Sequence, residues 1–141
     1  MSTKKTIRQA GLWDSPIQPV SLGRGFTFSD VQYDHSGALV WREGRSDRGV
    51  LVVQPADGQA LRDLNSELGV RAKVGYGGGD FTVGRGQVYF SEAESGRLYC
   101  QPVAGGTAHP ITPAFGNAAA PVLSPDGRWL LYVHSYEGQD A

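Results

Sequence analysis

Three turns in this chain end in a glycine and lead directly into an apolar run, and this recurrence is the strongest constraint on the fold. The glycines are Gly37, Gly86 and Gly127, which are separated by 49 and 41 residues. Large apolar residues stand two and four positions after each glycine, and alternate side chains of a strand share one face. The pattern therefore predicts three strands with an apolar face and core positions for Trp41 and Trp129. The apolar residues of this series are Leu39, Trp41, Val88, Phe90, Trp129 and Leu131.

A second repeat aligns Gly49–Gly58 with Gly96–Gly105. Both segments begin and end with glycine, and both have leucine at the third position and Gln-Pro at the sixth and seventh positions. In this register Cys100 takes the place of Val53, which predicts a small buried side chain and not a reactive thiol. Both repeats thus describe the same unit of short strands separated by glycine turns.

A period of 40–50 residues with about four short strands per unit is typical of β-propeller blades. The sequence predicts an all-β fold, an incomplete (truncated) β-propeller with WD40/TolB-like four-stranded blades, and irregular structure over residues 59–69. Because propellers typically close with 4–8 blades, we expect either a fragment of a larger protein or a homo-oligomer formed through the open strand edges. The expected parts are an N-terminal arm over residues 1–25 and a partial propeller over 26–141, with blades at about 26–65 and 77–112 and a half blade from 118.

Composition excludes several classes of partner and compartment. The net charge is −1, from 13 basic and 14 acidic residues, which argues against a nucleic acid or a membrane surface as partner. A single cysteine excludes an internal disulfide and a cysteine-rich zinc site. No signal peptide is recognisable and no apolar run approaches the length of about 18 residues that a membrane span needs, so the expected location is cytoplasmic.

Motifs for catalysis, cofactor binding and metal binding are absent from the sequence, so no catalytic residue, cofactor or metal is predicted. Gly75–Asp80 lacks the final glycine of a dinucleotide fingerprint, and strand residues follow it where a helix is required, so a tight entry into an inner strand is the better interpretation. No Gly-x-Ser-x-Gly motif occurs. The three histidines, His35, His109 and His134, have no second ligand at metal-binding spacing on the same element.

The carboxylates Glu92 and Glu94 alternate at one strand end, as an acid–base pair would. In the glycine register, however, Glu92 falls on Glu43. Recurrence at equivalent positions favours a solvated face or a hairpin salt bridge.

The order and spacing of several stretches resemble the N-terminal β-propeller of prolyl-oligopeptidase-family (S9) serine peptidases. The similarity is to the branch of bacterial dipeptidyl aminopeptidases and acylaminoacyl peptidases, and it covers residues 13–135. The stretches that carry it are Trp13–Ile17, Leu39–Arg45, Val70–Gly79, Val88–Ser91, Arg97–Tyr99, Ile111–Pro113 and Ser124–Trp129.

This resemblance implies that the propeller caps an α/β-hydrolase domain that carries a Ser-Asp-His triad, and restricts access to it. The expected function is therefore the non-catalytic propeller portion of such a peptidase, gating or supporting the hydrolase domain as its partner. The candidate loop facing substrate or that domain is Tyr76, Gly77, Gly78, Gly79 and Asp80. It departs from the family in having Val74 and Gly75 where His-Glu is usual.

The alternative belongs to a different class, a stand-alone propeller that binds or scaffolds other proteins. Ser124-Pro125-Asp126-Gly127 is a turn common to many propellers and fits both functions.

Overall fold

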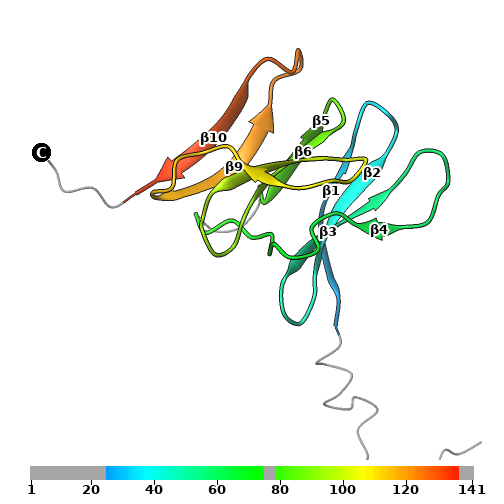
Figure 1. The fold of residues 1–141 in the computed structure, drawn as a ribbon, viewed down its shortest axis with the longest axis horizontal. Coiled ribbons are helices and arrows are strands. Elements are labelled where there is room, and N and C mark those ends of the chain that lie inside the picture. The colour runs from blue at the N-terminus through cyan, green and yellow to red at the C-terminus, as the bar shows by residue number, and fades with distance from the viewer. Residues whose placement is uncertain (1–24, 75–78, 137–141) are drawn as a thin grey trace, which may run out of the picture.

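The computed structural model describes residues 25–74 and 79–136, and over these residues the protein is built of antiparallel sheets without a helix (Figure 1). The first sheet has the order β1 (Thr27–Tyr33), β2 (Leu39–Gly44), β3 (Gly49–Gln54) and β4 (Arg62–Asp63). The middle sheet has the order β5 (Phe81–Gly84), β6 (Gln87–Ser91), β7 (Leu98–Pro102) and β8 (His109–Pro110). The third sheet pairs β9 (Asn117–Leu123) with β10 (Leu130–Ser135).

The glycine-marked turns connect the first and second strands of each sheet. Gly37 has a φ of 85° and donates its backbone N–H to the Asp34 carbonyl oxygen at 2.8 Å. Arg85 and Gly86 have φ angles of 53° and 73°, the left-handed pair typical of a two-residue hairpin turn. The structure therefore confirms the predicted turns. Glycine is favoured at Gly37 and Gly86 because it adopts a positive φ without steric cost.

The sheets follow one another along the molecule in chain order. Strand β5, the first of the middle sheet, contacts both β1 and β9, the first strands of its neighbours. Figure 1 shows the first sheet at one end, the third sheet at the other and the middle sheet between them. The all-β arrangement of successive antiparallel sheets is consistent with a fragment of a β-propeller.

The main core lies between the first and middle sheets. The side chains that form it are almost completely shielded from solvent, which is the largest source of stability in a fold of this kind. The core residues of the first sheet are Val40, Leu51 and Val53, and those of the middle sheet are Phe81, Val88 and Phe90.

The opposite face of the middle sheet is covered by β9, which contacts β6 and β7. Leu98 is fully buried and Cys100 is 7% exposed on this face, so the prediction of a buried cysteine is confirmed. Ala118 of β9 is also buried, and its carbonyl oxygen accepts a hydrogen bond of 2.9 Å from the Ser91 hydroxyl. The middle sheet is therefore packed on both faces.

The predicted core positions of two tryptophans are not those observed. Trp129 is 67% exposed, and Trp41 is half-buried with its Nε1 donating to Glu43 Oε1 at 3.1 Å. Trp41 pairs with Val52 in the first sheet, and Phe90 pairs with Tyr99 in the middle sheet. Trp41 and Phe90 therefore occupy equivalent positions in their sheets. The equivalent face is buried in the middle sheet but is the outer face in the first sheet, which explains the error for Trp41.

Trp129 is exposed because the turn at Gly127 is one residue longer than the turn at Gly37: Ser124 N–H donates to the Trp129 carbonyl oxygen, whereas Asp34 N–H donates to the Ala38 carbonyl oxygen. The extra residue reverses the face on which the following side chains lie.

Residues 59–69 are irregular as predicted, except that two of them form the short strand β4. The Asn65 side chain organises this segment, because its Oδ1 accepts the Leu51 N–H at 2.7 Å. Of the expected arm, only Gly25 belongs to the described residues, and the blade boundaries given above stay predictions. Within the two described ranges, no helix that could span a membrane occurs.

Candidate functional site

The glycine-rich loop predicted to face substrate or a second domain is described only in part. Tyr76, Gly77 and Gly78 lie outside the described residues, whereas Gly79 and Asp80 lead into β5. Gly79 has a φ of 71°, and its carbonyl oxygen accepts the N–H of Ala120 at 2.9 Å. A Cβ at Gly79 would lie 2.6 Å from the Ala120 Cα. Glycine is therefore required here because the backbones of the middle and third sheets approach closely.

Asp80 joins the middle sheet to the first sheet. Its Oδ2 lies 3.1 Å from Arg42 Nε on β2, and its Oδ1 accepts the Ala72 N–H at 2.6 Å. The side chains of Arg42 and Asp80 are only 16% and 15% exposed. Arg42 Nε also donates to the Val70 carbonyl oxygen at 3.0 Å. This partly shielded ion pair, with its added backbone hydrogen bonds, is a structural tie between two sheets.

Two further polar contacts attach β1 to the middle sheet. Gln32 donates from Nε2 to the Phe81 carbonyl oxygen at 3.0 Å and accepts the Val83 N–H at 3.1 Å. Asp34 Oδ1 accepts the Gly86 N–H at 2.9 Å. Burial raises the pKa of the Asp34 carboxyl, but hydrogen bonds from Ser36 and Gly86 outweigh burial and leave this pKa below its ordinary value.

Glu92 closes the turn between β6 and β7. Its carboxylate accepts hydrogen bonds from the Glu94 N–H at 2.8 Å and from the Ser95 N–H and hydroxyl at 2.7 Å each. Glu92 is 4% exposed, so the predicted solvated face is wrong at this position. The alternative of a hairpin salt bridge holds for the equivalent residue Glu43, which pairs with Arg45 at 3.0 Å.

Titratable and nucleophilic groups do not converge on one point in the part of the chain that the structure describes. His35 lies in a turn, His109 in β8 and His134 in β10, and no group of three metal-ligating side chains occurs among residues 25–74 and 79–136. Cys100 donates from Sγ to Gln87 Oε1 at 3.3 Å. Burial raises the pKa of this thiol, which makes it a poor nucleophile at neutral pH.

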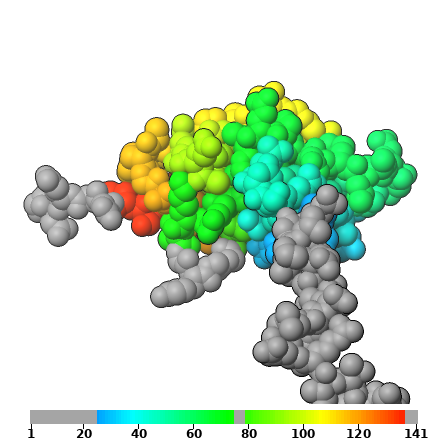
Figure 2. Space-filling view, turned by 90° about the horizontal axis from the view of Figure 1, so that it is seen from below, coloured from blue at the N-terminus to red at the C-terminus, as the bar shows by residue number. Residues whose placement is uncertain are grey.

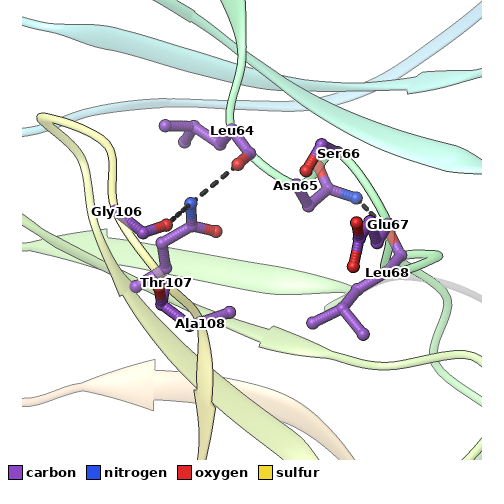
Figure 3. A pocket seen from close by; sticks show the side chains of 9 residues that line it. Leu64, Asn65, Ser66, Glu67, Leu68, Gly106, Thr107 and Ala108 are labelled. Carbon is purple, nitrogen blue, oxygen red and sulfur yellow. Dashed lines mark hydrogen bonds between the residues drawn. The ribbon is translucent and has the colours of Figure 1, made fainter.

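A cavity of about 290 Å³ lies between the irregular segment after β3 and the turn after β7 (Figure 3). Gln101 holds the two walls together, because its Nε2 donates at 2.7 Å to both the Leu64 and Gly106 carbonyl oxygens. Gln54 makes the equivalent bond to the Gln59 carbonyl oxygen at 2.8 Å. In both repeats the glutamine of the Gln-Pro pair therefore donates a hydrogen bond to the carbonyl oxygen five residues later. The sequence repeat marked these two glutamines as equivalent, but it did not predict this hydrogen bond.

A second cavity, of about 480 Å³, lies beside Arg42 at the tie to Asp80. Its walls carry charges of both signs. The charged residues that line it are Arg42, Arg45, Asp47, Arg48, Glu67, Arg71 and Glu94.

Comparison with known proteins gives a likeness to two solved structures. No protein-family model and no curated protein matches the chain. A puromycin-hydrolysing peptidase from Mycobacterium tuberculosis matches 86% of this chain with a TM-score of 0.68 and 25% sequence identity. A puromycin hydrolase matches 81% of this chain with a TM-score of 0.66 and 27% identity. The chain resembles a fragment of these enzymes. It spans only 21% and 20% of their lengths.

The tie between Arg42 and Asp80 generates a first prediction. We expect Asp80→Ala and Arg42→Ala each to lower the free energy of unfolding, and the double variant to lose less than the sum of the two. A coupling energy of about 0.5–3 kcal/mol is typical of groups in direct contact. Denaturant unfolding of the four proteins measures it. Independent roles for the two side chains predict additive losses and would contradict the tie.

The Glu92 carboxylate generates a second prediction, on pH. Burial raises its pKa, but hydrogen bonds from Ser95 and Glu94 and the charge of Lys73 outweigh burial and lower the pKa below its ordinary value of 4.5. A group with a lowered pKa stabilises the fold above 4.5, and this contribution is lost as the pH falls through the folded-state value. Glu92→Gln should therefore be less stable than the wild type at neutral pH.

That deficit should shrink as the pH falls below about 4.5, where both forms of residue 92 become uncharged. Denaturant unfolding at a series of pH values measures the difference. Glu94→Gln is the matched control, because it changes an exposed carboxyl in the same turn. A deficit that is equal at every pH would show that the charge of Glu92 is unimportant.

Proposed function

We propose that this chain is the non-catalytic β-propeller portion of a prolyl-oligopeptidase-like serine peptidase of the dipeptidyl aminopeptidase and acylaminoacyl peptidase branch. Its sheets would be WD40/TolB-like blades, and its partner would be the α/β-hydrolase domain of the parent protein. The observation that supports this most strongly is the match to a peptidase over 86% of this chain but only 21% of the peptidase. The chain would thus correspond to a limited, non-catalytic part of a much longer enzyme.

The contacts between sheets suit a role in gating or support. A propeller that limits access to an active site must keep its sheets in fixed positions, since the width of the passage depends on them. The Arg42–Asp80 pair, the Gln32 amide and the Gly79–Ala120 contact each join neighbouring sheets. In this proposal Tyr76, Gly77 and Gly78, which precede the Gly79–Asp80 junction, face the substrate or the hydrolase domain.

Reading the coding sequence downstream of Ala141 separates this function from the alternative of a stand-alone binding or scaffolding propeller. We expect further strand repeats followed, several hundred codons on, by a Gly-x-Ser-x-Gly motif between a strand and a helix. The exposed apolar surfaces of β1 and β10 are compatible with a binding module as well. Further blades that end in a stop codon would support the binding module and reject the peptidase.

The 141-residue chain by itself should not cleave peptides or esters. Incubation with an aminoacyl or acyl-peptide chromogenic substrate should give no turnover above the buffer rate, because bond cleavage needs an activated nucleophile and its base. The parent protein, if it carries the expected motif, serves as the positive control. Turnover by the purified chain that a serine-directed inhibitor abolishes would overturn the prediction.

A further inference from the structure

The side chain of Gln101 is enclosed by the protein, yet one of its polar atoms has no hydrogen-bond partner. Gln101 is 2% exposed, and its Oε1 accepts no hydrogen bond from the residues that the structure describes. The equivalent residue Gln54 is only half-buried. Nearly all buried polar atoms in proteins are hydrogen-bonded, because an unpartnered one destabilises the fold. The enclosed Oε1 therefore calls for a donor from outside the fold.

The orientation of the Gln101 amide is fixed by its neighbours. Both hydrogens of Nε2 are used, because Nε2 donates at 2.7 Å to the Leu64 and Gly106 carbonyl oxygens. Rotation of the amide by half a turn would place Oε1 against these two oxygens, which are acceptors as well. Oε1 is therefore an acceptor whose position the fold determines and whose hydrogen-bonding capacity the fold does not use.

Gln101 lines the cavity of about 290 Å³ between the first and middle sheets. Figure 3 shows residues 64–68 on one side of this space and residues 106–108 on the other. In Figure 2 these two segments, green and yellow, reach the surface beside each other along the upper edge. The lining residues Ser66, Glu67 and Thr107 are exposed, so the cavity is accessible from solvent. Its volume is several times the roughly 30 Å³ of one water molecule in the liquid, which leaves room for a small organic molecule.

The lining of this cavity is rich in hydrogen-bond acceptors and poor in donors. The Nδ2 of Asn65 and the Nε2 of Gln101 are both occupied by carbonyl oxygens of the protein. Among the described residues that line the cavity, Glu67 is the only charged one. An unused acceptor beside a negative charge is complementary to a positively charged group that carries N–H donors.

A divalent metal ion fits this lining less well than an ammonium group does. Ca²⁺ takes 6–8 oxygen ligands, several of them usually from carboxylates. No group of three metal-ligating side chains occurs among residues 25–74 and 79–136. A primary ammonium group has three N–H donors, and it can use one on Oε1 and direct the others to the hydroxyls and carboxylate at the entrance.

We propose that this cavity binds a small primary amine in its protonated form, with the ammonium group donating to Gln101 Oε1 and attracted by the Glu67 carboxylate. The inference goes beyond the proposed function. Its residues all belong to the described part of this chain, and none of them depends on a hydrolase domain.

Titration of the ¹⁵N-labelled 141-residue chain with ethylammonium, followed by NMR, tests the site. Saturable shifts are expected for the Gln101 side-chain amide and for the backbone N–H groups of residues 64–68 and 106–108. Tetramethylammonium carries the same charge but has no N–H donor. It should therefore give no saturable shift at these positions.

Three variants separate the cavity from a general effect of charge. Glu67→Gln should weaken ethylammonium binding about two- to fivefold, the effect typical of an exposed charge pair. Glu94→Gln is the matched control, because Glu94 is also exposed but does not line this cavity, and its affinity should equal that of the wild type. Gln101→Met removes Oε1 at similar side-chain length, so binding should be lost while cooperative unfolding is retained. Glu67→Gln and tetramethylammonium test the site even where Gln101→Met does not fold.

Four outcomes would overturn the proposal. Ethylammonium that gives no saturable shift would leave water as the donor to Oε1. Equal shifts with tetramethylammonium would show attraction by charge without a hydrogen bond. Equal affinities of Glu67→Gln and Glu94→Gln would place the bound cation outside this cavity, and a folded Gln101→Met variant that binds like the wild type would exclude Oε1 as the acceptor. None of these results bears on what the gene encodes downstream, so the proposed peptidase function is tested separately.

Discussion

The structure depends on the middle sheet having two apolar faces that must both be shielded from water. Val88 and Phe90 require the first sheet, and Leu98 and Cys100 require β9. Apolar burial contributes about 25 cal/mol per Å² and is not directional, so it draws sheets together without setting their relative positions. Stacking of at least three sheets is the direct consequence of a sheet that is apolar on both sides.

Polar contacts supply the geometry that burial leaves open. The Arg42–Asp80 pair and the Gln32 amide connect the first sheet to the middle sheet. The Gly79–Ala120 backbone contact and the Ser91 hydroxyl connect the middle sheet to the third. A net contribution of about 0.5–1.5 kcal/mol is typical of one hydrogen bond, so their main effect is to select one arrangement of the sheets.

The candidate loop has a structural role at the end that is described. Gly79 and Asp80 each make contacts that the fold itself requires, with Ala120 and with Arg42. The chain itself spans only about a fifth of the peptidase structures that it resembles.

The local pattern of residues was enough to predict the longer strands, the glycine turns and the burial of Cys100. These features depend on neighbours in the sequence, through backbone angles at Gly37 and Gly86 and through alternation along a strand. The Arg42–Asp80 tie and the buried role of Glu92 were not predictable in this way. No periodic signal links Arg42 to Asp80, and hydrogen bonds to a turn do not change the residue pattern.

The sequence by itself determined that the chain folds into repeated antiparallel sheets with equivalent apolar positions. Only the tertiary structure decided which of those positions are buried. Trp41 and Phe90 are equivalent in the repeat, yet Phe90 is fully buried and Trp41 is not. The physical reason is that an apolar side chain is buried only where another sheet covers the face on which it lies. Among the residues that the structure describes, the middle sheet has a neighbouring sheet on each side, whereas the first and third sheets have one.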